Sequence, residues 1–482
     1  MHNNMMCKID ANQITRYTFT LLLSAILLSG CATLTRSDFK QPEVKVPQQW
    51  QGAAVTGTAV ANREQWWKNF NDTVLDELID RALRTNNDLA AATIKVRRAL
   101  LQSKLTDTNL TPSVSVSADG TIGRNLNYGT GSDSYSVIGT LSYELDLWGR
   151  LASLRDADRW EAQATEADRR NTALSLIGTT ASSYWRIAYL NRRIALSEAG
   201  IAYSEKTLDL VMAKYKAGAV SALDPAQARQ NVASQKAELT QLIQQRAEAR
   251  NALAILFDQA PEYKVPERTQ LPHGPLPTVE AGLPADLLAR RPDLRAAELR
   301  LRESLANVDA TKASFFPTFT LTGNLGSSSI SLLNVMQNPI ASLGVGLTLP
   351  FIQWNTTKLT IRVSQTEYEE AVVNFRQTLY RALGDVENAL SAHAQYQAQS
   401  AYLEQALASS REAERLAEIR YRAGATGLQT WLDVQENRRT AEATLAENRL
   451  NRLNNLMTLY QSLGGDMRAA RLEQVNVASL RQ

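Results

Sequence analysis

The sequence lacks the features that mark several common classes of protein. Although 44% of its 482 residues are hydrophobic, it has no apolar run of about 18 residues, the length that a membrane-spanning helix needs. Only three histidines and two cysteines occur, and none belongs to a cluster with metal-site spacing. No phosphate-binding glycine loop is present. We therefore expect no enzyme activity, no cofactor and no metal.

Charge excludes a further class of partner. The net charge is only +3, and residues of both signs are spread along the chain. There is no basic stripe with interleaved aromatic residues, so we expect no nucleic-acid partner.

Both cysteines lie near the N-terminus, where residues 1–30 have the composition of an export signal. Positive charge precedes a short apolar stretch at residues 17–28. The stretch leads into Leu-Ser-Gly-Cys, ending at Cys31, which resembles a bacterial lipoprotein signal, although an ordinary signal peptide with a chance cysteine is the alternative. The resemblance implies lipidation of Cys31, and Ala32 in place of the aspartate of inner-membrane lipoproteins favours the outer membrane. A mature chain that begins at Cys31 has no second cysteine for a disulfide.

The chain contains an internal repeat with an offset of about 205 residues. Asn87-Asp88-Leu89 corresponds to Pro292-Asp293-Leu294, and Pro112 corresponds to Pro317. A proline-rich linker separates the two halves. The predicted divisions are a signal peptide (1–30), a lipid-anchored extension (31–65), a first repeat (66–270), a linker (271–282), a second repeat (283–464) and a C-terminal tail (465–482).

Each repeat has two stretches in which polar and apolar residues alternate, as in strands with two different faces. We predict strands at about 112–123, 134–147, 316–326 and 341–352. Each has about the 9–11 residues that a membrane-crossing strand needs. Four strands cannot close a barrel, whose smallest common size is about eight strands, and open edges are not tolerated in lipid. Several chains must therefore share one barrel, but this reasoning does not fix whether two or three do so.

The stretches after the strands predict unusually long helices. Residues 151–216 contain no proline, and none follows Pro350, so we predict long helices within 151–258 and 355–463. They carry coiled-coil seams: Val372, Phe375, Leu379, Leu383, Val386 and Leu390, and the seven-residue series Ala181, Ala188, Ala195 and Ala202. Because they are not hydrophobic all round, we expect these helices to lie outside lipid and extend the barrel as a tube.

Several segments, in this order, resemble the TolC-like outer-membrane factors, specifically the lipoprotein channel subunits of tripartite efflux systems. They are WWKNF at 66–70, LDEL at 75–78, YELDLWGR at 143–150, GLPADLL at 282–288, RRPDL at 290–294 and RYRAG at 420–424. The resemblance covers nearly the whole mature chain. One departure is PFIQWN at 350–355, which lacks the glycines usual at this junction and puts its geometry in doubt.

The resemblance implies a mixed α and β membrane protein that works as a homotrimer. Three chains would form a twelve-stranded outer-membrane β-barrel, continued by an α-helical coiled-coil tunnel through the periplasm. It would be a passive exit duct for drugs or other small toxic compounds, opened when a periplasmic adaptor and an inner-membrane transporter of the RND type engage it. A type I secretion conduit of the same fold is one alternative. The other is a lipid-anchored coiled-coil scaffold without a pore.

The turns after the long helices are the candidate functional segments. Gly218 follows the first long helix, and Gly424 and Gly427 follow the second. Glycine suits a helix C-terminus, which often needs a left-handed residue, and ordinary capping would explain it as well. In the family, these turns are the periplasmic tips where the adaptor docks.

Acidic residues after the second turn are the candidate gate. Asp433 and Glu436 are three positions apart and share one helix face, and the resemblance places them at the pore constriction, whereas a solvated helix face is the alternative. We expect three chains to present six carboxylates there. Asp224 is the counterpart of Asp433 in the first repeat, and we expect it to pair with Tyr421 or Arg422 of a neighbouring helix as a tip lock.

Overall fold

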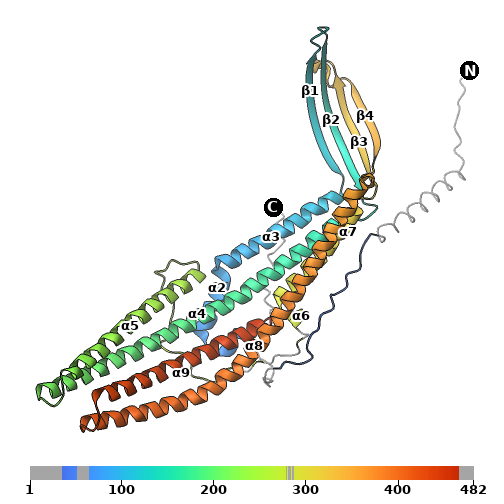
Figure 1. Ribbon diagram of the computed structural model, residues 1–482. Coiled ribbons are helices and arrows are strands. Elements are labelled where there is room, and N and C mark those ends of the chain that lie inside the picture. The colour runs from blue at the N-terminus through green and yellow to red at the C-terminus, as the bar shows by residue number, and fades with distance from the viewer. Residues whose placement is uncertain (1–34, 52–64, 278, 280–283, 285–286, 466–482) are drawn as a thin grey trace, which may run out of the picture. The chain divides into compact units, whose positions relative to one another are not determined.

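The structure, a computed structural model, describes residues 35–51, 65–277, 279, 284 and 287–465 (Figure 1). The predicted signal peptide, Cys31 and nearly all of the C-terminal tail lie outside the described residues. The described chain forms two compact units, and each combines segments of both repeats. The strand unit contains the N-terminal segment up to Glu43 with residues 95–166 and 296–377, and the helical unit contains the remaining described residues.

The strand unit holds one four-stranded antiparallel sheet with the order β1-β2-β3-β4 (Figure 1). Its strands are β1 (Ser113–Arg124), β2 (Gly131–Leu145), β3 (Thr318–Ser329) and β4 (Pro339–Thr348). The prediction of four strands in two hairpins is confirmed. The predicted end of the fourth strand is wrong, because Pro350–Ile352 forms a 3₁₀ helix, η6. Proline has no N–H for the ladder and fixes its own φ, so it ends the strand.

The sheet has almost no core of its own. Every residue of β4 and nearly every residue of β1 is exposed in the single chain, including the large apolar side chains of both strands. These are Val114, Val116, Ile122, Ile340, Leu343, Val345 and Leu347. Moreover, β1 and β4 are the two edges of the sheet, so each has one row of backbone groups that the chain leaves unpaired. The sheet is therefore incomplete as a water-soluble structure.

Long helices lead into and away from the sheet. The bounds are α3 (Asn87–Asp107), α4 (Arg150–Lys216), α7 (Pro292–Ala313) and α8 (Trp354–Arg422). The starts of α4 and α8 and their ends agree with the prediction within one residue, because no proline interrupts either stretch. No helix among the described residues combines the length and apolar character needed to cross a bilayer.

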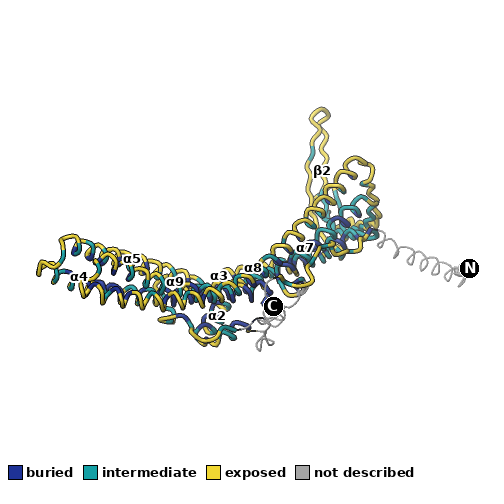
Figure 2. Tube along the Cα trace, turned by 60° about the horizontal axis from the view of Figure 1, so that its bottom comes forward, coloured by how far each residue is buried: buried dark blue, intermediate teal, exposed yellow. Residues whose placement is uncertain are grey.

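The helical unit contains the large hydrophobic core of the chain. Besides the continuations of α3, α4 and α8, its elements are η2 (Trp66–Phe70), α2 (Thr73–Thr85), α5 (Leu223–Leu256), α6 (Leu287–Arg290) and α9 (Leu428–Ser462). Two short 3₁₀ helices lie in the strand unit, η3 (Thr108–Leu110) and η5 (Leu332–Asn334). Figure 2 shows buried residues along the helices, whereas the labelled strand β2 has only exposed and intermediate residues.

The two predicted coiled-coil seams differ in how many of their residues are buried. Five of the six residues in the α8 seam are buried, from Phe375 to Leu390. In the alanine series, Ala181 and Ala188 are buried but Ala195 and Ala202 are exposed. A straight helix drifts by about 20° per heptad relative to a seven-residue repeat, so a stripe that begins in the core turns toward the surface after a few heptads.

Candidate gate at the helical tips

The two turns at the ends of α4 and α8 have the same backbone geometry. Gly218 and Gly424 both have a φ of +74°. In each turn the glycine N–H donates three residues back, to Tyr215 O at 2.9 Å and Tyr421 O at 3.0 Å, and the following residue donates five residues back. This is the Schellman pattern, and it confirms the expected left-handed glycines. Gly427 differs, because its φ of −75° is ordinary and it directly precedes α9.

An apolar cluster joins the four helices beside these turns. It combines side chains from α4, α5, α8 and α9, and we call it the tip cluster: Val211, Ala228, Ala417, Tyr421, Leu428, Trp431 and Leu432. The rings of Tyr421 and Trp431 have centroids 5.1 Å apart. The α4–α5 and α8–α9 hairpins therefore pack against each other at their tips through a small core, separate from the large one.

Two polar contacts cross from α4 to α8 around this cluster. Lys214 Nζ donates to the backbone oxygen of Tyr421 at 2.9 Å and lies 4.3 Å from the centroid of its ring. Tyr203 OH donates to Glu418 Oε2 at 2.8 Å. Burial, with the Glu418 hydrogen bond and charge, raises the pKa of Tyr203, so this hydroxyl stays protonated and remains a donor. Sequence reasoning missed both contacts, because their partners are 207 and 215 residues apart.

The three predicted lock residues lie close together but form a different set of bonds within one chain. Arg422 pairs with Glu418 on its own helix at 2.7 Å. The Tyr421 side chain is 2% exposed, and its hydroxyl has no hydrogen-bond partner among the described residues. Burial raises the pKa of Tyr421, and the charge of Asp224 raises it further. Asp224 is therefore near Tyr421, although the described residues show no hydrogen bond or ion pair between them, and the lock stays a prediction.

The two predicted gate carboxylates are exposed on α9. Asp433 Oδ1 accepts from Gln429 Nε2 at 2.7 Å. Glu436, whose side chain is 55% exposed, pairs with Arg439 one turn further along the helix. Both carboxylates are therefore held by residues of their own helix and face away from the tip cluster. Their role in a gate stays a prediction.

The tip has the means for mechanical rather than chemical work. Among the residues that the structure describes, no cluster of histidine, cysteine and acidic side chains could hold a metal ion. The cross-helix contacts combine a small apolar cluster with single hydrogen bonds at its rim. A typical hydrogen bond contributes about 1 kcal/mol net, and about 1.5–3 kcal/mol when one partner is charged, so the rim contacts add to the burial of the tip cluster in holding the two hairpins together.

The paired coiled-coil hairpins and the four-stranded sheet define a class, that of outer-membrane channel subunits. The sequence profile described as "Outer membrane efflux protein" matches residues 78–257 and 283–465. The chain belongs to this outer membrane efflux protein family, and the match in two parts agrees with the internal repeat. The family consists of channel proteins rather than enzymes. The chain is accordingly an outer-membrane channel component of a tripartite efflux pump.

Individual relatives agree over nearly the full length. The chain is 32% identical to the pyoverdine export outer membrane protein OpmQ of Pseudomonas putida over 95% of this chain and 98% of that protein. It is 30% identical to the toxin and drug export protein A of Aggregatibacter actinomycetemcomitans, over 94% and 98% of the two chains. Among solved structures, the open state of the outer membrane channel MtrE of Neisseria gonorrhoeae matches with 30% identity and a TM-score of 0.79, covering 90% of this chain and 98% of that one.

Proposed function

We propose that three copies of this chain form a closed twelve-stranded barrel in the outer membrane, which serves as the exit duct for drugs or other small toxic compounds. The observation that carries the proposal is the sheet, which has exposed apolar side chains and two unpaired edges. Three chains give a lumen wide enough for solutes, whereas an eight-stranded barrel from two chains is filled by side chains. The names of two relatives, which refer to export of pyoverdine and of drugs, support small exported compounds.

The partners follow from the position of the duct. A periplasmic adaptor and an inner-membrane transporter of the RND type supply energy and select substrates. The adaptor docks on the tip turns at Gly218, Gly424 and Gly427. A lipid on Cys31 anchors the mature chain to the outer membrane.

The gate is formed by Asp433 and Glu436, which three chains present as rings at the closed end of the tunnel. Crowded carboxylates at that end attract cations and retard anions. The cross-helix contacts of Lys214 and Tyr203 hold the hairpins of each chain in the closed arrangement. Opening separates the hairpins at the tip cluster.

Single-channel conductance in a planar bilayer tests this function. The wild-type protein should give small, rarely open events that divalent cations block. The double variant Asp433→Ala/Glu436→Ala should give larger events without this block. The matched control is Glu412→Ala, because Glu412 forms the same kind of exposed pair with Arg415 three residues on, but on α8 rather than on α9. The control should behave as wild type.

Two other outcomes would contradict parts of the proposal. Unchanged conductance and block in the double variant would move the gate elsewhere in the tunnel. A folded helical protein that never inserts into the bilayer would favour the scaffold over the channel.

The cross-helix contacts are tested in the same assay. Lys214→Met keeps the length of the side chain but removes its hydrogen bond to Tyr421, so the open probability should increase several-fold. Lys216→Met is the control, because Lys216 lies in the same last turn and makes no such contact among the described residues. Equal open probabilities in both variants and wild type would remove Lys214 from the closed-state lock.

A type I secretion conduit remains the second candidate. It is favoured by the relative from Aggregatibacter, whose name includes toxin export. Export of small dyes that depends on this chain, without export of a protein, would favour the efflux duct.

A further inference from the structure

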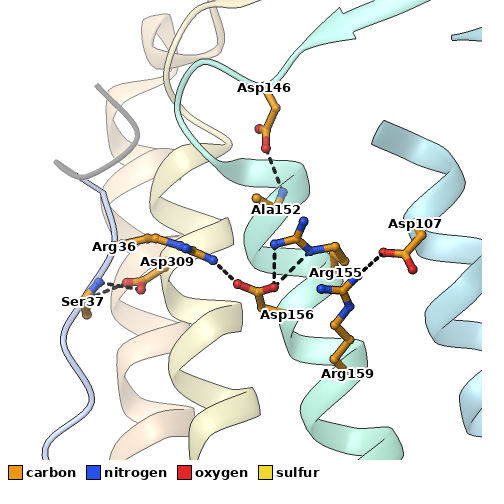
Figure 3. Close-up of polar contacts among 9 residues, drawn as sticks. All are labelled: Arg36, Ser37, Asp107, Asp146, Ala152, Arg155, Asp156, Arg159 and Asp309. Atoms are coloured by element: carbon orange, nitrogen blue, oxygen red, sulfur yellow. Dashed lines mark hydrogen bonds and ion pairs between the residues drawn. The ribbon is translucent and has the colours of Figure 1, made fainter. Parts of the chain in front are cut away.

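The extended N-terminal segment contacts a buried carboxylate in the strand unit. We call residues 35–39 the anchor strap. Both the backbone N–H and the hydroxyl of Ser37 donate to the Asp309 carboxylate on α7, each at 2.7 Å (Figure 3). Lys312 Nζ lies 3.3 Å from Ser37 Oγ and 3.5 Å from Asp309 Oδ1. Ser37 therefore supplies two of the hydrogen bonds to this carboxylate.

The burial of the Asp309 carboxylate shows why its hydrogen bonds to Ser37 matter. Asp309 is only 5% exposed, and a buried carboxylate is costly unless donors satisfy it. Its partners here are Ser37 and Lys312, so removal of the strap would leave the carboxylate with half of its protein contacts or fewer. Within α7 the carboxylate has one partner, Lys312 at 3.5 Å, whereas the strap supplies two shorter hydrogen bonds.

Contacts on either side of Ser37 hold the strap in register. Arg36 pairs with Asp156 on α4, which Arg155 also contacts at 2.9 Å (Figure 3). On the other side, the Phe39 ring lies under the guanidinium of Arg302, with 4.2 Å between the guanidinium carbon and the ring centroid. Three successive kinds of contact, namely an ion pair, a buried hydrogen-bond pair and a cation–π pair, therefore fix adjacent residues of one extended segment.

The strap ends close to the sheet. Thr35 Oγ1 donates to the backbone oxygen of Trp148 at 2.6 Å, three residues after the end of β2. Cys31 precedes Thr35 by four residues, which span at most about 14 Å when fully extended. Without these contacts, the next residue along the chain that packs against a core would be Val44, thirteen residues from Cys31, and the possible reach would increase to about 45 Å.

We propose that Asp309 and Asp156 are positioning residues that dock the anchor strap and so fix the entry point of the lipid beside the end of β2. This inference rests on the proposed lipidation of Cys31. By limiting the reach of the anchor, the docked strap holds the membrane-facing sheet of each chain near the lipid surface while several chains join into one barrel. The docking site thus assists assembly in the membrane.

Hydrogen exchange tests the docking step. In the purified assembled protein, the backbone amide of Ser37, which donates to Asp309, should exchange slowly, and Asp309→Ala should accelerate its exchange roughly tenfold or more, as expected for loss of a hydrogen bond to a charged acceptor. Asp107→Ala is the matched control, because Asp107 pairs with Arg159 in the same unit at 3.1 Å without touching the strap. Equal exchange in wild type and Asp309→Ala would overturn the docking site.

Assembly in cells tests the positioning role. Asp309→Ala should reduce the yield of outer-membrane oligomer several-fold in the lipidated protein. In a Cys31→Ser background exported through an ordinary signal peptide, the same substitution should cause no further loss. Equal losses in both backgrounds would show that Asp309 acts only on folding and would overturn the positioning role alone.

Mass spectrometry of the mature N-terminus shows whether Cys31 carries a lipid, so that failure of the proposed lipidation can be distinguished from failure of the docking site. A diacylglycerol on Cys31 is required by both. A mature chain without lipid would overturn both the anchoring in the proposed function and the positioning role, whatever the exchange experiment shows.

Discussion

The two strand-to-helix junctions of the strand unit perform the same task with different chemistry. At the first, between β2 and α4, Asp146 accepts from the backbone N–H of Leu151 at 2.9 Å and from that of Ala152 at 2.8 Å, and Figure 3 shows the second of these bonds. Glu144 and Arg150 form a forked ion pair at 2.8 and 2.9 Å. Gly149 makes the turn with a φ of +70°. This polar network explains why the YELDLWGR segment has its acids, glycine and arginine at these positions.

An aromatic stack completes the first junction. Trp148 packs on Phe316 with 4.8 Å between ring centroids, and its Nε1 donates to Pro317 O at 2.7 Å. Because Phe316 and Pro317 immediately precede β3, this contact ties the two hairpins of the sheet together. The first junction is therefore completed by contacts within the chain.

The second junction, between β4 and α8, has no comparable network among the described residues. Pro350 begins the 3₁₀ helix η6, whose N-cap Leu349 makes no side-chain cap and whose C-cap is Gln353, directly before α8. Trp354 is 70% exposed, and Phe351 and Ile352 are exposed as well. The doubt that the missing glycines raised is thus resolved by a proline-initiated turn that needs no left-handed residue. Both repeats therefore have the same strand-to-helix topology. They differ in that the second junction leaves its apolar side chains available for contact with lipid or a neighbouring chain.

The largest expected difference concerns the two tryptophans. Trp148→Ala should lower the free energy of unfolding by about 2–3 kcal/mol, because it removes a packed ring and a hydrogen bond. Trp354→Ala should cost less than about 0.5 kcal/mol in the isolated chain, as an exposed site does. Unfolding of both variants in detergent, followed by circular dichroism, measures the difference. Equal losses would break the comparison and place Trp354 in a contact between chains.

A smaller difference is expected for the residues that cap the two helices. Asp146→Ala should destabilise the chain by about 1–2 kcal/mol, because two N–H groups at the start of α4 lose their acceptor. Gln353→Ala should have almost no effect, since Gln353 is exposed and its side chain makes no hydrogen bond among the described residues. The same unfolding measurement applies, and a loss with Gln353→Ala as large as with Asp146→Ala would contradict the described asymmetry.

The junctions also show which parts of the structure could be predicted from the sequence. Strand alternation and proline-free helices are local patterns, so the four strands and the ends of α4 and α8 were predicted closely. The end of β4 is predicted too late because the apolar residues continue to Ile352, although the alternation stops at Leu349 and Pro350 lacks the N–H that the ladder needs.

Contacts between distant segments could not be predicted in the same way. Ser37 and Asp309 are 272 residues apart, and Lys214 and Tyr421 are 207 apart. Each of these residues is of a type that is common on protein surfaces, so the sequence around it does not mark it, and only the fold brings the partners together. The predicted gate residues Asp433 and Glu436 share an exposed face as expected, because that inference required only the helical spacing.

The smallest expected effect concerns two glycines with different backbone conformations, a left-handed one at Gly149 and a helical one at Gly384. Gly149→Ala should cost about 1 kcal/mol, because alanine is strained at positive φ. Gly384→Ala should instead stabilise the chain by up to about 1 kcal/mol, because Gly384 lies inside α8 with open space where a Cβ would be added. Opposite shifts of the unfolding midpoint would confirm that the first junction needs its glycine for backbone conformation. A stabilising Gly149→Ala would mean that this turn can adopt the glycine-free geometry of the second junction, and the contrast between the two junctions would then lie in their side-chain contacts alone.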